Sequence, residues 1–256
     1  MKQLSTLCAV LFMGIFFAAQ AMAHFGMVIP SGSMVMQQDP RAIDLTLSFS
    51  HPFEMIGMPL EKPAKFFVTT GGRQSDLKGA LKETKCMGQP AWQASYPIKR
   101  PGLYTFCMEP APYWEPAEDC FIIHYTKTVV AAFGDDEGWD EAVGLKTEII
   151  PLSKPFGLYA GNVFQGIVKL DGQPVPYAQV EVEYYNRDKK AQAPSDYMIT
   201  QTIKADGNGV FTYAAPTPGW WGFAALTTAD FQIEHQGEPK AVELGAVLWV
   251  EFSPWN

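Results

Sequence analysis

"IDLTLSFSH", residues 43–51, alternates apolar and polar side chains over its whole length. Every second position from Ile43 to Phe49 is apolar, and the positions between them are Asp, Thr or Ser. Because successive side chains of a β-strand point to opposite faces, this pattern predicts a strand with one buried face. His51 follows the apolar positions in register, so the strand is predicted to end with a histidine on its buried side.

Similar segments, separated by Gly and Pro turns, follow along the chain, and no long stretch has the period of a helix. The other strand candidates are "AKFFVTTGGRQSDL" (64–77), "WQASYPIKRPGLYTFCME" (92–109), "CFIIHYTKTVVAAF" (120–133), "VFQGIVKLDGQPVPYAQVEVEYYN" (163–186) and "TIKADGNGVFTYAAPTPGWWGFAALTT" (202–228). The sequence therefore predicts an all-β protein built from two β-sandwiches of the immunoglobulin or transthyretin-like kind.

A polar, glycine-containing loop at residues 134–144, followed by a proline-containing segment, predicts a boundary between the two sandwiches. We expect the N-terminal, metal-binding domain to cover residues 24–154 and the C-terminal domain to cover residues 155–256. The C-terminal domain resembles the transthyretin-like or carboxypeptidase-regulatory-like modules of exported proteins.

Residues 1–23 have the order of a cleavable signal peptide, with Lys2, an apolar run from Leu7 to Ala19 and small residues up to Ala23. The run is shorter than the roughly 18 apolar residues that a membrane helix needs. We therefore predict export to the periplasm and removal of residues 1–23, which would make His24 the first residue.

Charge and motifs argue against several classes of function. The formal net charge of −8 disfavours nucleic acid, which is bound mainly through Lys and Arg, and suits the handling of cations. No G-x-S-x-G, H-E-x-x-H, P-loop or dinucleotide-binding motif occurs, so no enzyme activity is predicted. Cys86, Cys107 and Cys120 match no zinc pattern, and both a single disulfide and free buried thiols remain open.

His24 is the first candidate metal ligand. At a chain terminus, its α-amine and its Nδ1 atom can close a chelate ring on one ion. The amine pKa is about 7.7–8.0 and the imidazole pKa about 6.5, so a divalent ion displaces few protons near neutral pH. Such nitrogen donors suit Ni, Co, Cu and Zn better than Mg or Ca. The alternative is that cleavage falls before a histidine by chance.

Two more histidines and one glutamate could complete such a site. His51 ends the first strand, and Glu54 offers a carboxylate as a ligand or as a partner of an imidazole N–H. His124 lies inside the candidate strand at 120–133. As alternatives, the histidines are structural core residues and Glu54 is a solvated surface charge. His235, in a polar turn, is expected to be exposed.

Methionines also occur near the first two histidines in the sequence, at Met27, Met34, Met36, Met55 and Met58. Thioethers select Cu(I), so copper is an alternative metal. Packing in an apolar core is the other explanation for these residues.

Six stretches are distinctive: "AHFGMVIPS" (23–31), "SFSHPFE" (48–54), "PYWEPAEDCFIIHYTKTVVAAFG" (112–134), "GWDEAVGLKTEIIPL" (138–152), "PFGLYAGNVFQG" (155–166) and "GWWGFAAL" (219–226). Together they resemble a family of exported bacterial proteins, described partly as a domain of unknown function. The family is also described as the periplasmic component of nickel/cobalt uptake systems of the energy-coupling-factor type, which are ABC transporters. The resemblance implies that Ni²⁺ or Co²⁺ is captured and that membrane transporter subunits are the partners. It carries over ligand positions at His24, His51, His124 and Glu54.

Two other functions remain open from the sequence alone. A copper centre built on the terminal histidine could oxidise a polysaccharide. Alternatively, the chain is a non-catalytic adhesion or carbohydrate-binding sandwich in which the histidines are structural.

Overall fold

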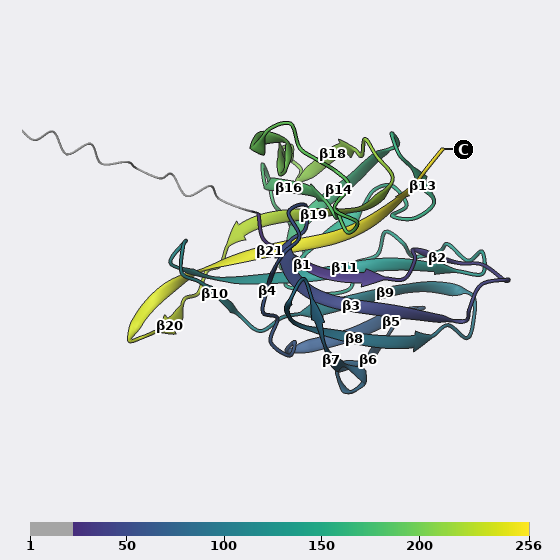
Figure 1. The fold of residues 1–256 in the computed structure, drawn as a ribbon, viewed down its shortest axis with the longest axis horizontal. Coiled ribbons are helices and arrows are strands. Elements are labelled where there is room, and N and C mark those ends of the chain that lie inside the picture. The colour runs from purple at the N-terminus through teal and green to yellow at the C-terminus, as the bar shows by residue number, and fades with distance from the viewer. Residues whose placement is uncertain (1–22, 256) are drawn as a thin grey trace, which may run out of the picture.

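The computed structural model describes residues 23–255, which form an all-β sandwich architecture, as the sequence predicts (Figure 1). The helices of this part are two short 3-10 turns, η1 (Lys78–Ala80) and η2 (Asp196–Met198). Neither has the length and apolarity that crossing a membrane requires. Apart from Ala23, the predicted signal peptide lies outside the described residues.

The strands form three main sheets. The first has the order β1 (Phe25–Pro30), β3 (Ala42–His51), β8 (Gln89–Pro97) and β7 (Lys82–Cys86), with β4 (Ile56–Met58) on β3. The second has the order β17 (Gln201–Lys204), β16 (Gln179–Tyr184), β19 (Gly219–Thr228), β21 (Glu238–Ser253), β11 (Cys120–Ala132), β9 (Gly102–Glu109), β5 (Lys65–Thr70) and β6 (Arg73–Asp76). The third joins β12 (Thr147–Pro151), β14 (Val163–Leu170) and β15 (Gln173–Pro174), with β18 (Val210–Ala214) on β14.

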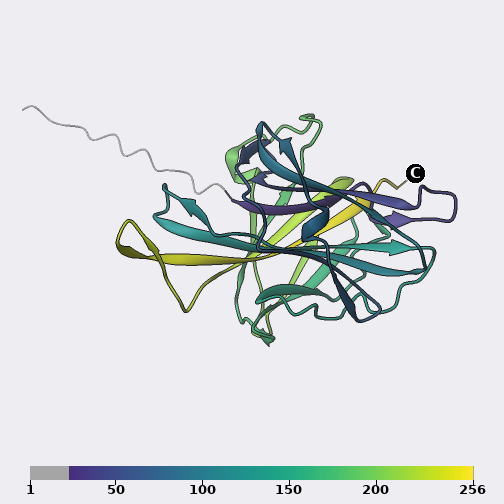
Figure 2. The ribbon, with the colours of Figure 1, turned by 90° about the horizontal axis from the view of Figure 1, so that it is seen from below.

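Four short strands extend the second sheet at its sides. They are β2 (Met34–Val35) and β10 (Tyr113–Glu115), which pair with β11, and β13 (Leu158–Tyr159) and β20 (Ile233–His235), which pair with β21. The hairpin of β20 and β21 extends beyond the body of the molecule in both ribbon views (Figure 2).

The long strand β21 links the two halves of the chain. It pairs antiparallel with β19 and parallel with β11, and Figure 1 shows it running between the two groups of strands. Strands before and after residue 154 thus belong to one hydrogen-bonded sheet, and the division into domains at 154/155 stays a prediction.

Two large apolar cores lie between the sheets. The first lies between the β1–β3–β8 sheet and the β5–β9–β11 part of the second sheet, and includes Leu47 and Phe106. The second lies between the third sheet and β16, β19 and β21, and includes Phe164 and Phe223. A smaller core under β1 joins Phe25 to Trp249 of β21. As a result, β1 is buried on both faces, together with the residue that precedes it.

The three cysteines within residues 23–255, Cys86, Cys107 and Cys120, are free thiols. Cys107 is buried, and burial strongly raises its thiol pKa. It therefore behaves as a small core side chain.

Candidate metal site

Three of the four histidines meet at one place. His24 directly precedes β1, and His51 ends β3. These strands pair antiparallel in a register that places the residue before β1 opposite the end of β3, and the two ring centroids are 4.7 Å apart. His124 on β11 lies beside them, with its Nδ1 accepting a 3.4 Å hydrogen bond from the Gly26 N–H. The exposed fractions of the three histidines are only 8%, 7% and 1% in chain order.

A hydrogen bond holds one nitrogen of each imidazole. Nε2 of His24 bonds to Glu115 Oε2 at 3.0 Å, and Nε2 of His124 bonds to Glu243 Oε1 at 3.2 Å. Because a carboxylate only accepts, these bonds place the ring proton on Nε2 and leave a lone pair on Nδ1. His51 Nδ1 donates to the Ala23 carbonyl at 2.8 Å, which leaves its Nε2 lone pair available.

Burial keeps the His24 ring neutral. It lowers the His24 pKa to about 4, from an ordinary 6.5, and the positive charges of protonated His51 and His124 lower it further, against the opposing charge of Glu115. Burial by itself would raise the pKa of Glu243, but the hydrogen bond and charge of His124 outweigh it, so the net shift is downward. A neutral imidazole is the form in which histidine binds a metal, and burial favours this form at His24.

Two carboxylates beside the histidines, those of Glu115 and Glu243, are not among the predicted site residues. Glu115 belongs to β10, a strand of three residues that pairs with the start of β11. Glu243 reaches His124 through the parallel pairing of β11 with β21. Neither contact has a local signal, because each depends on strand pairing between distant segments.

Glu54 makes no hydrogen bond or ion pair with a histidine within residues 23–255. It is exposed and lines a second cavity of about 520 Å³, together with Ala23, Glu181 and Glu183. His235 also lies elsewhere, on β20, where its ring stacks on Trp114 at 4.0 Å and is only partly exposed. Of the four predicted ligands, the structure brings together His24, His51 and His124.

The methionines do not gather at the histidines. Met27 is buried, and its sulfur accepts a hydrogen bond from Ser50. Met34 and Met36 are exposed, and Met34 lies in β2, beside the far end of β11 from His124. Met58 packs in the first apolar core.

No set of three or more His, Cys, Asp or Glu side chains within residues 23–255 is already arranged around a metal position. The candidate donors are the three imidazoles, each with one nitrogen hydrogen-bonded to Glu115, Glu243 or the Ala23 carbonyl. Imidazole donors oriented by carboxylates or carbonyls are the usual surroundings of Ni, Cu and Zn.

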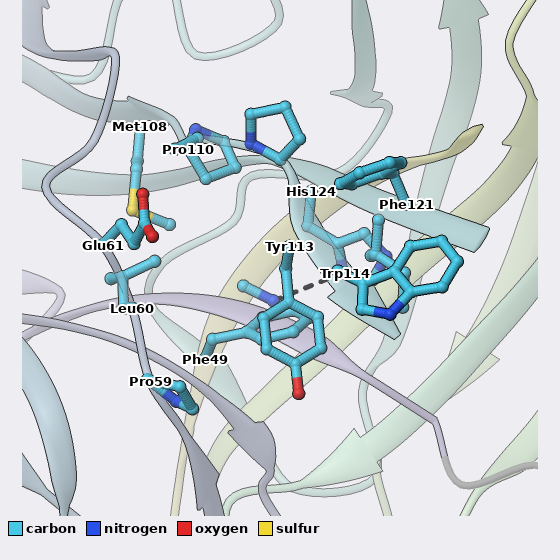
Figure 3. Close-up of a pocket in the computed structure, with 14 residues that line it drawn as sticks. Phe49, Pro59, Leu60, Glu61, Met108, Pro110, Tyr113, Trp114, Phe121 and His124 are labelled. Carbon is cyan, nitrogen blue, oxygen red and sulfur yellow. Dashed lines mark hydrogen bonds between the residues drawn. The ribbon is translucent and has the colours of Figure 1, made fainter. Parts of the chain in front are cut away.

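An aromatic cavity of about 370 Å³ borders the cluster on the side of His124. Its walls include Phe49, Tyr113 and Trp114 (Figure 3). The Phe49 ring contacts the rings of His24 and His124, each with centroids 5.7 Å apart. We call this space the aromatic cavity.

A family model described as "Domain of unknown function (DUF4198)" matches residues 21–229. No curated protein matches the chain.

Three solved structures illustrate what the fold is similar to. The D0-D1 domain of intimin is 14% identical, with 90% of this chain and 99% of that one covered, at a TM-score of 0.25. The adhesin InvE of Yersinia pseudotuberculosis is 10% identical, with 86% and 58% covered, at a TM-score of 0.23. A putative carbohydrate-binding protein from Bacteroides uniformis is 11% identical, with 86% and 97% covered, at a TM-score of 0.26.

Proposed function

The chain belongs to this family of unknown function, and we propose that it is an exported, non-catalytic protein that binds Ni²⁺ or Co²⁺ at His24, His51 and His124. One observation carries the proposal: three buried imidazoles lie together, and Glu115 and Glu243 hold Nε2 of His24 and His124, so the lone pairs of these two rings are on Nδ1. Carboxylate partners of this kind fix the tautomer and raise the basicity of ligating histidines.

Cleavage after Ala23 would add a donor to this cluster. The Ala23 carbonyl, which accepts the 2.8 Å hydrogen bond from His51 Nδ1, is joined to the His24 nitrogen by one peptide bond. His51 Nδ1 therefore lies within about 5 Å of the future α-amine. Cutting the bond frees His51 Nδ1 and creates the amine beside it. Metal–nitrogen bonds of about 2.0–2.1 Å need donors about 3–4 Å apart, so a small adjustment suffices.

The sequence supports export and a role in transport as parts of this proposal. The signal-like residues 1–23 favour a site in the periplasm, and the resemblance to nickel/cobalt uptake components makes membrane transporter subunits the proposed partners. In this scheme the protein captures the ion outside the inner membrane and delivers it to the transporter.

Calorimetric titration of Ni²⁺ into two forms of the protein tests the proposal. One form begins at His24, and the other carries one additional glycine before it, which blocks the chelate of amine and Nδ1. We expect the first form to bind one ion and the extended form to bind at least about tenfold more weakly. His235→Ala is the matched control and should bind as the unchanged protein does. Equal affinity of both forms, or no binding by either, would sink the proposal.

Copper is the second candidate cargo, because nitrogen donor sets bind Cu²⁺ more tightly than Ni²⁺ or Co²⁺ as a rule. The same titrations with Cu²⁺, followed by an assay for oxidised polysaccharide products in the presence of a reductant, separate the two functions. A copper-dependent product would replace metal capture by an oxidase activity. Binding of several metals without a product would support capture.

A further inference from the structure

The aromatic cavity has the size and surface of a small-molecule site. Its volume of about 370 Å³ lies at the lower end of the range for such sites, roughly 300–1,000 Å³. Phe49, Tyr113, Trp114 and Phe121 supply much of its wall, and Figure 3 shows several of these rings around the same space. Aromatic walls favour a flat, apolar ligand that can stack on them.

His124, Tyr113 and Trp114 contribute polar groups to the lining of the cavity. His124 is buried, and its Nδ1 accepts only the 3.4 Å hydrogen bond from Gly26, drawn as the dashed line in Figure 3. A bond of this length is weak, so an incoming group can replace it. Tyr113 and Trp114 are half-buried, and neither the Tyr113 hydroxyl nor the Trp114 indole N–H has a hydrogen-bond partner within residues 23–255.

The charges around the cavity favour a cationic or neutral occupant. Glu61 is the charged residue that lines it, and its carboxylate is exposed. Behind the histidines lie the carboxylates of Glu115 and Glu243. An anionic ligand would be repelled from both sides.

We propose that the aromatic cavity binds a small, flat, aromatic metal chelator, so that the divalent ion is captured together with its organic ligand. This inference rests on the proposed function, since His124 belongs both to the histidine cluster and to the cavity wall. An ion on His124 Nδ1 borders the cavity, and coordination positions that the protein leaves open are filled by a ligand there. The carbon skeleton of that ligand stacks against Tyr113, Trp114 and Phe121.

The test uses 1,10-phenanthroline as an aromatic chelator and 1,7-phenanthroline as an isomer of equal size that cannot chelate. Calorimetry on the protein beginning at His24 compares Ni²⁺ alone, the 1:1 complex of Ni²⁺ with 1,10-phenanthroline, and Ni²⁺ mixed with the 1,7-isomer. We expect the complex to bind at least about tenfold more tightly than Ni²⁺ alone, and the 1,7-isomer to add nothing. Trp114→Ala should abolish the gain without changing the affinity for Ni²⁺ alone, and Trp255→Ala, at an exposed tryptophan, should retain it.

The outcomes separate this inference from the proposed function. If Ni²⁺ binds alone and the complex binds no more tightly, or if Trp114→Ala keeps the gain, the chelator inference is wrong and metal capture stands. If Ni²⁺ does not bind but both phenanthrolines bind equally, the cavity takes apolar molecules without a metal, and both ideas fail. Circular dichroism of each variant confirms that the fold is retained.

Discussion

At the scale of single residues, Glu115 determines which imidazole nitrogen of His24 is free to bind a metal. Its carboxylate accepts a hydrogen bond of 3.0 Å from the His24 Nε2–H and so favours the tautomer with a free Nδ1. Loss of such a partner weakens metal binding by about 10–100-fold. Glu115→Gln should therefore lower the Ni²⁺ affinity by this factor, measured by calorimetry. Glu109→Gln, which alters a surface ion pair with Lys65, is the control and should change nothing.

Glu183 makes the stability of the protein depend on pH. It is only 1% exposed, and burial raises its pKa to about 8, against hydrogen bonds from Thr200 and the Phe53 N–H. The folded chain therefore holds this proton between the unfolded pKa of about 4.5 and about 8, where the unfolded chain has released it. The contribution of Glu183 is complete below that window and is lost as pH rises through it.

Urea unfolding across this window tests the effect. The free energy of unfolding of the unchanged protein should fall relative to that of Glu183→Gln as pH rises from about 4.5 to about 8. Glutamine keeps an oxygen that can accept the Phe53 N–H and does not titrate. A constant difference between the two proteins over the window would show that Glu183 ionises freely in the folded state.

At the scale of strands, two glycines make room for His124 where β1, β11 and β21 lie together. A Cβ atom at Gly245 would lie 2.6 Å from His124 Nε2, and one at Gly26 would lie 3.0 Å from His124 Cβ and closer still to the Thr126 hydroxyl. Gly245→Ala should therefore push the imidazole away from Glu243 and lower the Ni²⁺ affinity. Overpacking of this kind costs about 1–3 kcal/mol of stability. Gly79→Ala, whose Cβ would meet nothing within 4 Å, is the control. If calorimetry shows that Gly245→Ala binds Ni²⁺ as tightly as the unchanged protein, Gly245 is not needed to make room for His124.

Within a strand, the sequence predicts which side chains are buried, because burial follows the alternation of apolar and polar residues. It does not predict which strands pair or in which register. In β3, Ile43, Leu45 and Leu47 are buried as the alternation requires. Ser48 and Ser50 are buried as well, because β1 and the small core beneath it cover the second face. The burial of His51 follows from local alternation, whereas its contact with His24 needs the β1–β3 register. The register of β11 with β21, which brings Glu243 to His124, has no local signal at all.

At the scale of the whole molecule, one buried ion pair joins the second sheet to β12, which lies before residue 154 but belongs to the third sheet. Lys127 of β11 donates to Glu148 of β12 at 2.6 Å, and their side chains are 2% and 5% exposed. Glu148 also accepts hydrogen bonds from the backbone N–H groups of Val143 and Gly144, so the same carboxylate anchors the loop before β12. The pair therefore connects the second sheet to the third.

Breaking this pair from one side leaves a buried charge without its partner, which costs about 3–5 kcal/mol. Lys127→Met should accordingly destabilise the protein by that amount in urea unfolding, because the Glu148 carboxylate then keeps only backbone partners. The double variant Lys127→Met with Glu148→Gln removes the unpaired charge but keeps an acceptor for Val143 or Gly144, so it should recover most of the loss. If the double variant is as unstable as Lys127→Met alone, the cost comes from packing around the lysine stem, and the ion pair does not stabilise the contact between the second and third sheets.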